Sequence, residues 1–136
     1  MNDIIKATRP VNICRVAGAG NKFVYLLDQK ADYYINLVPG LKYWDMCASE
    51  ALMMARMGIV TDAYLRPLIY DHTKSNYTVM DGIIAAKNKK VHDVASRRIY
   101  EGTGKDLPSL HRMVQAESRE RRAKRAKMEA NSKPQQ

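Results

Sequence analysis

The spacing of apolar positions predicts alternating strands and helices in the first part of the chain. Residues 11–17 are short, apolar and β-branched, which is typical of a strand that ends at Gly18-Ala19-Gly20. Apolar positions then recur at helical spacing over 21–30, and 31–38 returns to a strand-like composition. The pattern therefore predicts a strand, a helix and a second strand in succession.

Pro39-Gly40 interrupts regular structure after the second strand. A helix is then predicted over about 45–57, with Gly58 directly after its C-terminal end. Residues 59–71 predict a hairpin that turns at the Leu-Arg-Pro of 65–67. The proline confines this hairpin to a sheet edge, because it cannot donate a ladder hydrogen bond.

Residues 79–88 predict a further strand, which leads into a helix over 89–101 that ends at the Gly-Thr-Gly of 102–104. This order of elements predicts an α/β domain over 1–104, with a mixed sheet and flanking helices. Residues 105–136 are expected to form a basic extension outside the core, as a charged helix or a disordered arm.

The formal net charge of +9 is concentrated in this extension. Between Ser118 and Lys133, seven Lys and Arg residues outnumber two Glu, which gives a local net charge of +5. A helix with positive charge on all sides suits a polyanion such as RNA, and a solvated charged extension is the alternative. Basic residues at 87–90 and 97–98 could extend such a footprint. The candidate contacts are Arg119, Arg121, Arg122, Lys124, Arg125 and Lys127.

With 136 residues, 46% of them hydrophobic, the chain is expected to form one core. Its two cysteines, Cys14 and Cys47, lie far apart and suggest neither a disulfide framework nor a zinc site. No apolar run approaches the roughly 20 residues of a membrane span, and no clear targeting signal is present. These features favour an intracellular, reducing compartment such as the cytoplasm or the mitochondrial matrix.

Asp45 follows Trp44 at the start of the helix predicted over 45–57. A carboxylate at this position accepts hydrogen bonds from free backbone N–H groups, and the helix dipole favours its negative charge. The same geometry serves a metallophosphatase, because a hard cation binds carboxylate oxygen while the helix end offers N–H groups to phosphate. The position of Asp45 alone does not decide between a helix cap and a metal ligand.

Five segments occur in a fixed order along the chain: GAGNK at 18–22, KADYYI at 30–35, KYWDMCASEAL at 42–52, MGIVTDAYLRPLIY at 57–70 and GIIAA at 82–86. Together they resemble the C-terminal half of the magnesium-dependent, lithium-sensitive phosphatases, which include the inositol monophosphatases. The run most resembles the 3'(2'),5'-bisphosphate nucleotidases, whose signature contains Trp-Asp, a following Cys-Ala, and Thr-Asp after Gly-Gly. The resemblance covers roughly positions 9 to 100.

The resemblance implies roles for particular residues. Asp45 matches the metal-binding aspartate of the family, and Trp44 matches the residue that packs against it and orients it. Gly18, Gly20 and Lys22 match the glycine-rich turn and the lysine that approach the nucleotide phosphate. Simpler interpretations remain open, since the glycines could be turn residues, Lys22 a solvated charge and Trp44 a core residue.

Other polar residues favour structural interpretations. Thr61 and Asp62 are expected to serve a strand end and a turn. His72, His92 and His111 have no nucleophile placed nearby by local sequence, so they are expected to be surface or packing residues. An alanine stripe at 48, 51 and 55 predicts close packing of its helix.

The chain also departs from the family pattern. Met57-Gly58 replaces Gly-Gly, and AYLRPL at 63–68 replaces a turn that usually contains glycine. The family brings most of its metal-binding carboxylates from the N-terminal half, through a glutamate pair and an Asp-Pro motif, and this sequence contains neither dipeptide. One aspartate cannot assemble a two-metal site. Asp45 is therefore expected to be a vestigial ligand that acts mainly as a helix cap, with no cofactor bound by the chain in isolation.

The favoured function is a non-catalytic remnant of a nucleotidase-like phosphatase, acting as a structural and RNA-contacting subunit of a larger assembly. A protein partner would cover the apolar face that the missing N-terminal half leaves exposed. The first alternative is half of a split nucleotidase that hydrolyses 3'-phosphoadenosine 5'-phosphate, with Mg²⁺ bound once a partner completes the site. The second alternative is a nucleotide-binding module without chemistry.

Overall fold

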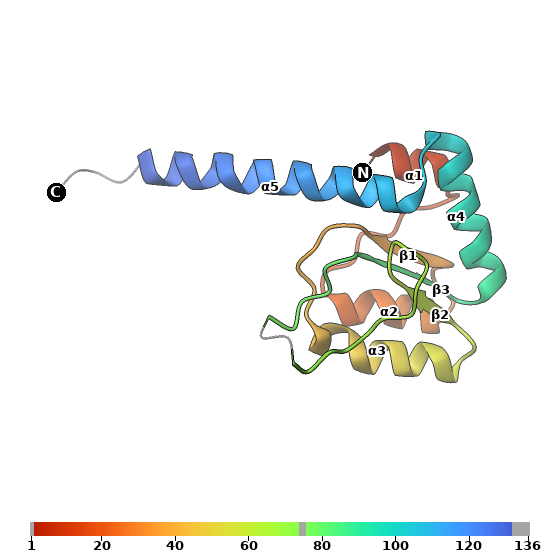
Figure 1. Cartoon of the computed structure of the whole chain (residues 1–136). Helices are drawn as coiled ribbons and strands as arrows, with labels where there is room; N and C mark the ends of the chain where they lie inside the picture. The colour runs from red at the N-terminus through yellow and green to blue at the C-terminus, as the bar shows by residue number, and fades with distance from the viewer. Residues whose placement is uncertain (1, 74–75, 132–136) are drawn as a thin grey trace.

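The computed structural model describes residues 2–73 and 76–131 (Figure 1). Three short strands and five helices occur in these ranges. In chain order they are α1 (Asn2–Thr8), α2 (Ala19–Leu27), β1 (Tyr33–Asn36), α3 (Tyr43–Ala55), β2 (Ile59–Thr61), β3 (Ile83–Ala86), α4 (Lys89–Thr103) and α5 (Leu107–Asn131).

The three strands form one sheet in the order β1-β3-β2, with β3 in the centre. Ala86 lies opposite Tyr33 of β1 on one side and opposite Ile59 of β2 on the other. Both pairings are antiparallel. The α/β class with flanking helices is confirmed, and the described strands contain no parallel pair of the kind a mixed sheet would have.

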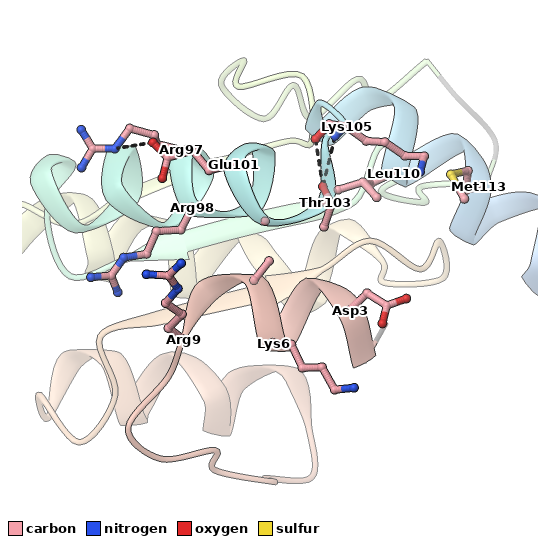
Figure 2. A pocket seen from close by; sticks show the side chains of 12 residues that line it. Asp3, Lys6, Arg9, Arg97, Arg98, Glu101, Thr103, Lys105, Leu110 and Met113 are labelled. Carbon is pink, nitrogen blue, oxygen red and sulfur yellow. Dashed lines mark hydrogen bonds and ion pairs between the residues drawn. The ribbon is translucent and has the colours of Figure 1, made fainter.

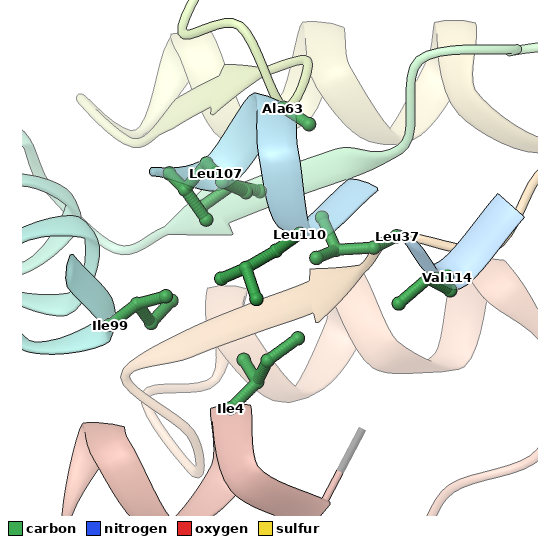
Figure 3. Close-up of a cluster of buried hydrophobic side chains, with 8 residues drawn as sticks. Ile4, Leu37, Ala63, Ile99, Leu107, Leu110 and Val114 are labelled. Carbon is green, nitrogen blue, oxygen red and sulfur yellow. The ribbon is translucent and has the colours of Figure 1, made fainter. Parts of the chain in front are cut away.

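Helices cover both faces of the sheet (Figure 1). One face packs on α2 and α3, through a cluster that includes Phe23, Met53 and Ile83. The opposite face packs on α1, α4 and the start of α5; Figure 3 shows Ile4, Leu37, Ile99 and others from this cluster. Because both faces are covered, the central strand β3 is apolar throughout and fully buried, with Ile84 in one cluster and Ile83 in the other.

Most of the predicted elements form close to their expected bounds. The helix after Gly18, the strand before Pro39, the strand that ends at Ala86 and the helix that follows it are all present. The last of these helices ends as the sequence predicts. Gly104 adopts a left-handed conformation with φ of 65°, and its N–H donates to the carbonyl of Tyr100 at 2.8 Å.

The strand predicted over 11–17 is wrong. This segment runs over the surface between α1 and α2 without regular structure, and Val11 and Ile13 are exposed. Its β-branched composition had predicted a strand. Such composition stabilises a strand only where the side chains can pack on a sheet face, and these do not.

The hairpin predicted over 59–71 is also wrong, because β2 ends at Thr61 and pairs with β3 instead. The carboxylate of Asp62 accepts hydrogen bonds from the backbone N–H groups of Tyr64 and Arg66, at 2.8 and 2.9 Å. These bonds turn the chain away from the sheet directly after β2.

The basic extension forms a helix, and its first part belongs to the core. Leu107, Leu110, His111 and Val114 are buried, whereas nearly all residues from 116 to 130 are exposed. The sequence had placed all of 105–136 outside the core, and residues 132–136 lie outside the described part of the chain. In the described part, no helix combines the length and the apolar character that a membrane span needs.

Candidate functional site

Helices α2 and α3 begin at the same end of the domain and pack against each other beneath the sheet (Figure 1). The glycine-rich turn precedes α2, and the Trp-Asp pair opens α3. The fold therefore brings the two family-like motifs to one end of the molecule. Free N–H groups at two helix ends are a suitable environment for an anion.

The two glycines of the first motif differ in what the backbone requires. Gly18 is the residue before α2 and has φ of 78°, a conformation that strains residues with a Cβ. Gly20 lies within α2, and a Cβ added there would meet nothing within 4 Å. Only Gly18 is required by backbone conformation.

Lys22 lies on the first turn of α2 and is half-buried. Its ammonium lies 5.5 Å from the ring centroid of Tyr34, which is a cation–π distance. Burial of the Tyr34 ring raises the pKa of its hydroxyl. Lys22 is thus positioned by an aromatic ring near the start of α2.

Asp45 lies inside the first turn of α3, because the helix begins at Tyr43 rather than at Asp45. Its Oδ2 accepts a hydrogen bond from the backbone N–H of Lys42 at 2.8 Å. This contact joins the third helical residue to the residue before the helix, which is half of a capping box. The carboxylate therefore stabilises the start of α3, as the sequence predicted, although from a different position.

Trp44 does not pack in the core. The residue is 65% exposed, and the centroid of its ring lies 6.2 Å from the ring centroid of Tyr77. The indole therefore forms a surface contact beside Asp45 rather than a buried support for it.

The described residues contain no group of three or more His, Cys, Asp or Glu side chains that could hold a metal ion. Asp45 is the carboxylate that the family resemblance selects, and here it is engaged with the backbone of Lys42. Further carboxylates would have to join Asp45 before this end of the domain could bind Mg²⁺ in the two-metal manner.

The other polar residues have structural contacts, as predicted. The hydroxyl oxygen of Thr61 lies 2.9 Å from Nε2 of the buried His92. Burial lowers the pKa of this histidine. Asp62 is buried and forms an ion pair with Arg66 at 2.7 Å, in the turn after β2. His111 is also buried, with its Nδ1 2.9 Å from the carbonyl of Leu37, and His72 is exposed.

Half of the candidate basic residues on the exposed part of α5 are ion-paired within the helix. Three of its basic residues form ion pairs with glutamates one turn away, namely Arg121 with Glu117, Lys124 with Glu120 and Arg125 with Glu129. Such pairs stabilise a solvent-exposed helix. The remaining candidates, Arg119, Arg122 and Lys127, form no ion pair with a described residue.

The exposed side of α3 is apolar, which the sequence did not predict. The alanine stripe was expected to pack closely, yet its three residues are exposed. Glu50 is only partly exposed, and the hydroxyl of Tyr70 donates a hydrogen bond to its carboxylate. We call the uncharged surface the α3 face; its residues are Trp44, Cys47, Ala48, Ala51, Leu52, Met54 and Ala55.

Comparison with known proteins identifies the same phosphatase family that the ordered motifs resemble. The sequence model of the inositol monophosphatase family matches residues 2–104. The chain belongs to the inositol monophosphatase family. The match includes both motifs at the α2 and α3 ends and stops before α5.

Within the inositol monophosphatase family, the chain is similar to the 3'(2'),5'-bisphosphate nucleotidases 1 of several organisms. It is 39% identical to the rat protein over 88 residues, which are 65% of this chain and 29% of the relative. It is 36% identical to the human protein over 101 residues, or 74% of this chain and 32% of the relative. The Dictyostelium discoideum protein is 31% identical over 80 residues, which are 59% of this chain and 26% of the relative. The chain spans about three tenths of the length of these relatives.

Two departures from the family pattern coincide with left-handed backbone. Met57, in place of the first glycine of Gly-Gly, has φ of 59° and is 83% exposed. Leu65, in the turn that usually contains glycine, has φ of 61°. A Cβ at Gly58 would lie 2.6 Å from the terminal methyl of Met53 and 3.0 and 3.2 Å from the carbonyl oxygens of Met53 and Ala86, so there is little room for a side chain at this second glycine. This inositol monophosphatase homologue thus has left-handed backbone at two positions where it carries no glycine.

Proposed function

We propose that this chain is a non-catalytic, structural member of the inositol monophosphatase family that works as a subunit of a larger assembly. The observation that supports this proposal is the α3 face. Its seven exposed side chains carry no charge, and Trp44, Leu52 and Met54 are each more than half exposed. Contiguous exposed apolar surface is typical of a protein interface.

A protein is the expected occupant of the α3 face. The relatives are about three times longer than the matched region, so in those proteins more polypeptide accompanies this part of the fold. The surface also lacks charged residues and includes Trp44 and Met54, whose residue types are enriched in interfaces. In the proposed assembly, the partner would bury this surface and stabilise the subunit.

The exposed part of α5 would provide a second contact. It continues in a straight line beyond the domain, so it can reach a molecule that the domain does not touch (Figure 1). Arg119, Arg122 and Lys127 keep their charge free of ion pairs with described residues. An RNA component is the proposed partner of this arm, because basic side chains on an exposed helix bind a polyanion without requiring a groove.

The test is the native mass of the tagged endogenous protein after gentle purification. We expect a particle much larger than the 15.5 kDa of the chain alone. Met54→Glu places a charge on the α3 face and should release the chain from the particle. Val11→Glu is the control, because Val11 is also an exposed apolar residue but lies in the segment before α2. A monomeric native protein, or equal retention of both variants, would contradict the proposal.

A second candidate is the split nucleotidase, which the common position of the α2 and α3 ends favours (Figure 1). In this case a partner would supply the missing carboxylates, and Asp45 would exchange its contact with Lys42 for Mg²⁺. Magnesium-dependent hydrolysis of 3'-phosphoadenosine 5'-phosphate by the purified assembly would then be lost in Asp45→Asn. Equal turnover by the variant and the wild type would reject this candidate.

A further inference from the structure

Helices α1 and α4 and the start of α5 enclose a cleft of about 600 Å³ (Figure 2). Five basic side chains line it against two acidic ones, which gives a net charge of +3. The charged residues are Lys6, Arg9, Arg97, Arg98 and Lys105, with Asp3 and Glu101. The cleft lies on the opposite face of the sheet from α2 and α3, so it is separate from the candidate site at the ends of those helices (Figure 1).

The two helices that form the cleft are held close together. A Cβ added to Gly102 of α4 would lie 2.7 Å from the Cβ of Ala7, so glycine is needed for this approach. Arg98 crosses from α4 to α1, where its Nη1 donates a hydrogen bond to the carbonyl of Thr8 at 3.2 Å. This bond fixes the guanidinium of Arg98 beside the residue that follows α1.

That residue is Arg9, whose backbone turns at the end of α1 with φ of 49° and an N–H bond to the carbonyl of Lys6 at 3.1 Å. Figure 2 shows the side chains of Arg9 and Arg98 extending into the same part of the gap between the helices, and both line the cleft. An anion bound between these two guanidinium groups would be attracted by both of them.

No carboxylate among the described residues is ion-paired with either arginine. Glu101 pairs instead with Arg97 at 3.7 Å, along the edge of α4 that points away from α1, and Asp3 lies at the opposite end of α1 from Arg9 (Figure 2). The acidic side chains of the cleft are therefore placed away from the paired guanidinium groups.

We propose that Arg9 and Arg98 form a binding site for a phosphate group in the cleft between α1 and α4. Two guanidinium groups can donate several hydrogen bonds to phosphate oxygens in a fixed geometry. The phosphate belongs to a free phosphorylated compound or to a polynucleotide backbone, and both offer the same oxyanion. This site does not depend on the assembly proposed above, since every residue in it comes from this chain.

The site also changes where a polyanion would bind most strongly. Half of the candidate basic residues on α5 are neutralised by glutamates on the same helix. Arg9 and Arg98 are not. If a polynucleotide is the source of the phosphate, this cleft rather than the arm makes the tighter contact.

The test measures binding of two probes to the full chain. Inorganic phosphate is titrated by calorimetry, and a fluorescently labelled single-stranded oligouridylate is titrated by anisotropy. The variants are Arg9→Gln and Arg98→Gln, with Arg97→Gln as the matched control, because it removes the same charge from a residue that Glu101 already neutralises. Arg9→Gln removes no described hydrogen bond, so it keeps the test independent of the Arg98 contact with Thr8.

We expect Arg9→Gln and Arg98→Gln each to weaken binding roughly tenfold, and Arg97→Gln to change it less than about twofold. For the oligonucleotide, each of the first two variants should also lower the slope of log affinity against log salt by about one. Binding of phosphate alone identifies a free compound as the source, and binding of the oligonucleotide with competition by phosphate identifies a polynucleotide. Absence of binding to both probes, or equal losses in all three variants, would overturn the proposal.

Discussion

Replacing Met57 by glycine should stabilise this protein. Helix α3 ends in a Schellman motif, in which the N–H of Gly58 donates to the carbonyl of Met53 at 2.8 Å and the N–H of Met57 to that of Met54 at 3.1 Å. Met57 occupies the left-handed position of this motif, with φ of 59°. Glycine is the residue that this position favours, because it has no Cβ to clash with the following carbonyl.

The size of the effect follows from two opposing terms. A left-handed residue with a Cβ costs about 1–2 kcal/mol. Glycine removes this cost but adds about 0.4–1 kcal/mol of conformational entropy to the unfolded chain. Met57 is 83% exposed, so its side chain contributes little buried area. The expected net gain in the free energy of unfolding is about 0.5–1 kcal/mol, or roughly 3 °C in Tm for a chain of this length.

The assay is chemical and thermal denaturation of Met57→Gly beside two controls. Met57→Ala keeps a Cβ in the left-handed position and should leave the stability nearly unchanged. Met54→Gly makes the same exchange at an exposed position inside α3 and should lower the stability by about 1 kcal/mol. The reasoning is refuted if Met57→Gly is no more stable than the wild type, or if Met57→Gly and Met54→Gly change in the same direction.

Three further predictions concern stability. Leu65→Gly should also raise the unfolding free energy by about 0.5–1 kcal/mol in denaturant titrations, because φ of 61° is left-handed; a loss would contradict this. Asp45→Ala should lower it by about 1 kcal/mol by removing the bond to Lys42, whereas Asp45→Asn, which keeps an acceptor, should lose less. Burial lowers the pKa of His92 in the folded chain below its ordinary value of about 6.5. At pH values below 6.5 the unfolded chain therefore binds more protons at this histidine than the folded chain does. The free energy of unfolding should therefore be at its full value above that pH and should fall as the pH drops below it, by up to about 1.4 kcal/mol per pH unit. Unfolding curves of His92→Gln should show a flatter pH dependence, and the matched control is His72→Gln, which makes the same exchange at an exposed histidine.

The elements that could be predicted are those whose local pattern agrees with their packing. The helix over 89–103 has a capping Asn88, whose side chain accepts from the N–H of Val91, and a left-handed Gly104 at its end. Residues 11–17 have the composition of a strand without a sheet face to pack on. The hairpin failed because β2 pairs with a segment distant in sequence, and a side-chain contact of Asp62 redirects the chain. The pairing with β3 has no local sequence signal, whereas the turn at Asp62 was expected from the sequence.

The candidate site could be predicted only in part. The family motifs selected Asp45, and its contact with Lys42 supports the capping role. The exposed side of α3 was missed, because an alanine stripe at helical spacing is compatible with either close packing or an exposed surface. Arg9 was missed as well. Its neighbour Arg98 is 89 positions away in the numbering, and only the close approach of α1 to α4 at Gly102 brings the two together.

The most direct test of the assembly is the reactivity of the two cysteines. Cys47 lies on the α3 face and Cys14 in the segment before α2, and both are exposed free thiols in the chain alone. The measurement is the rate of alkylation of each thiol, by mass spectrometry, in gently lysed source cells and in the isolated chain. The account predicts that Cys47 is protected in the lysate relative to Cys14, while both react in the isolated chain. Alkylation of Cys47 at the same rate in both samples would show that nothing covers the α3 face and would contradict the account.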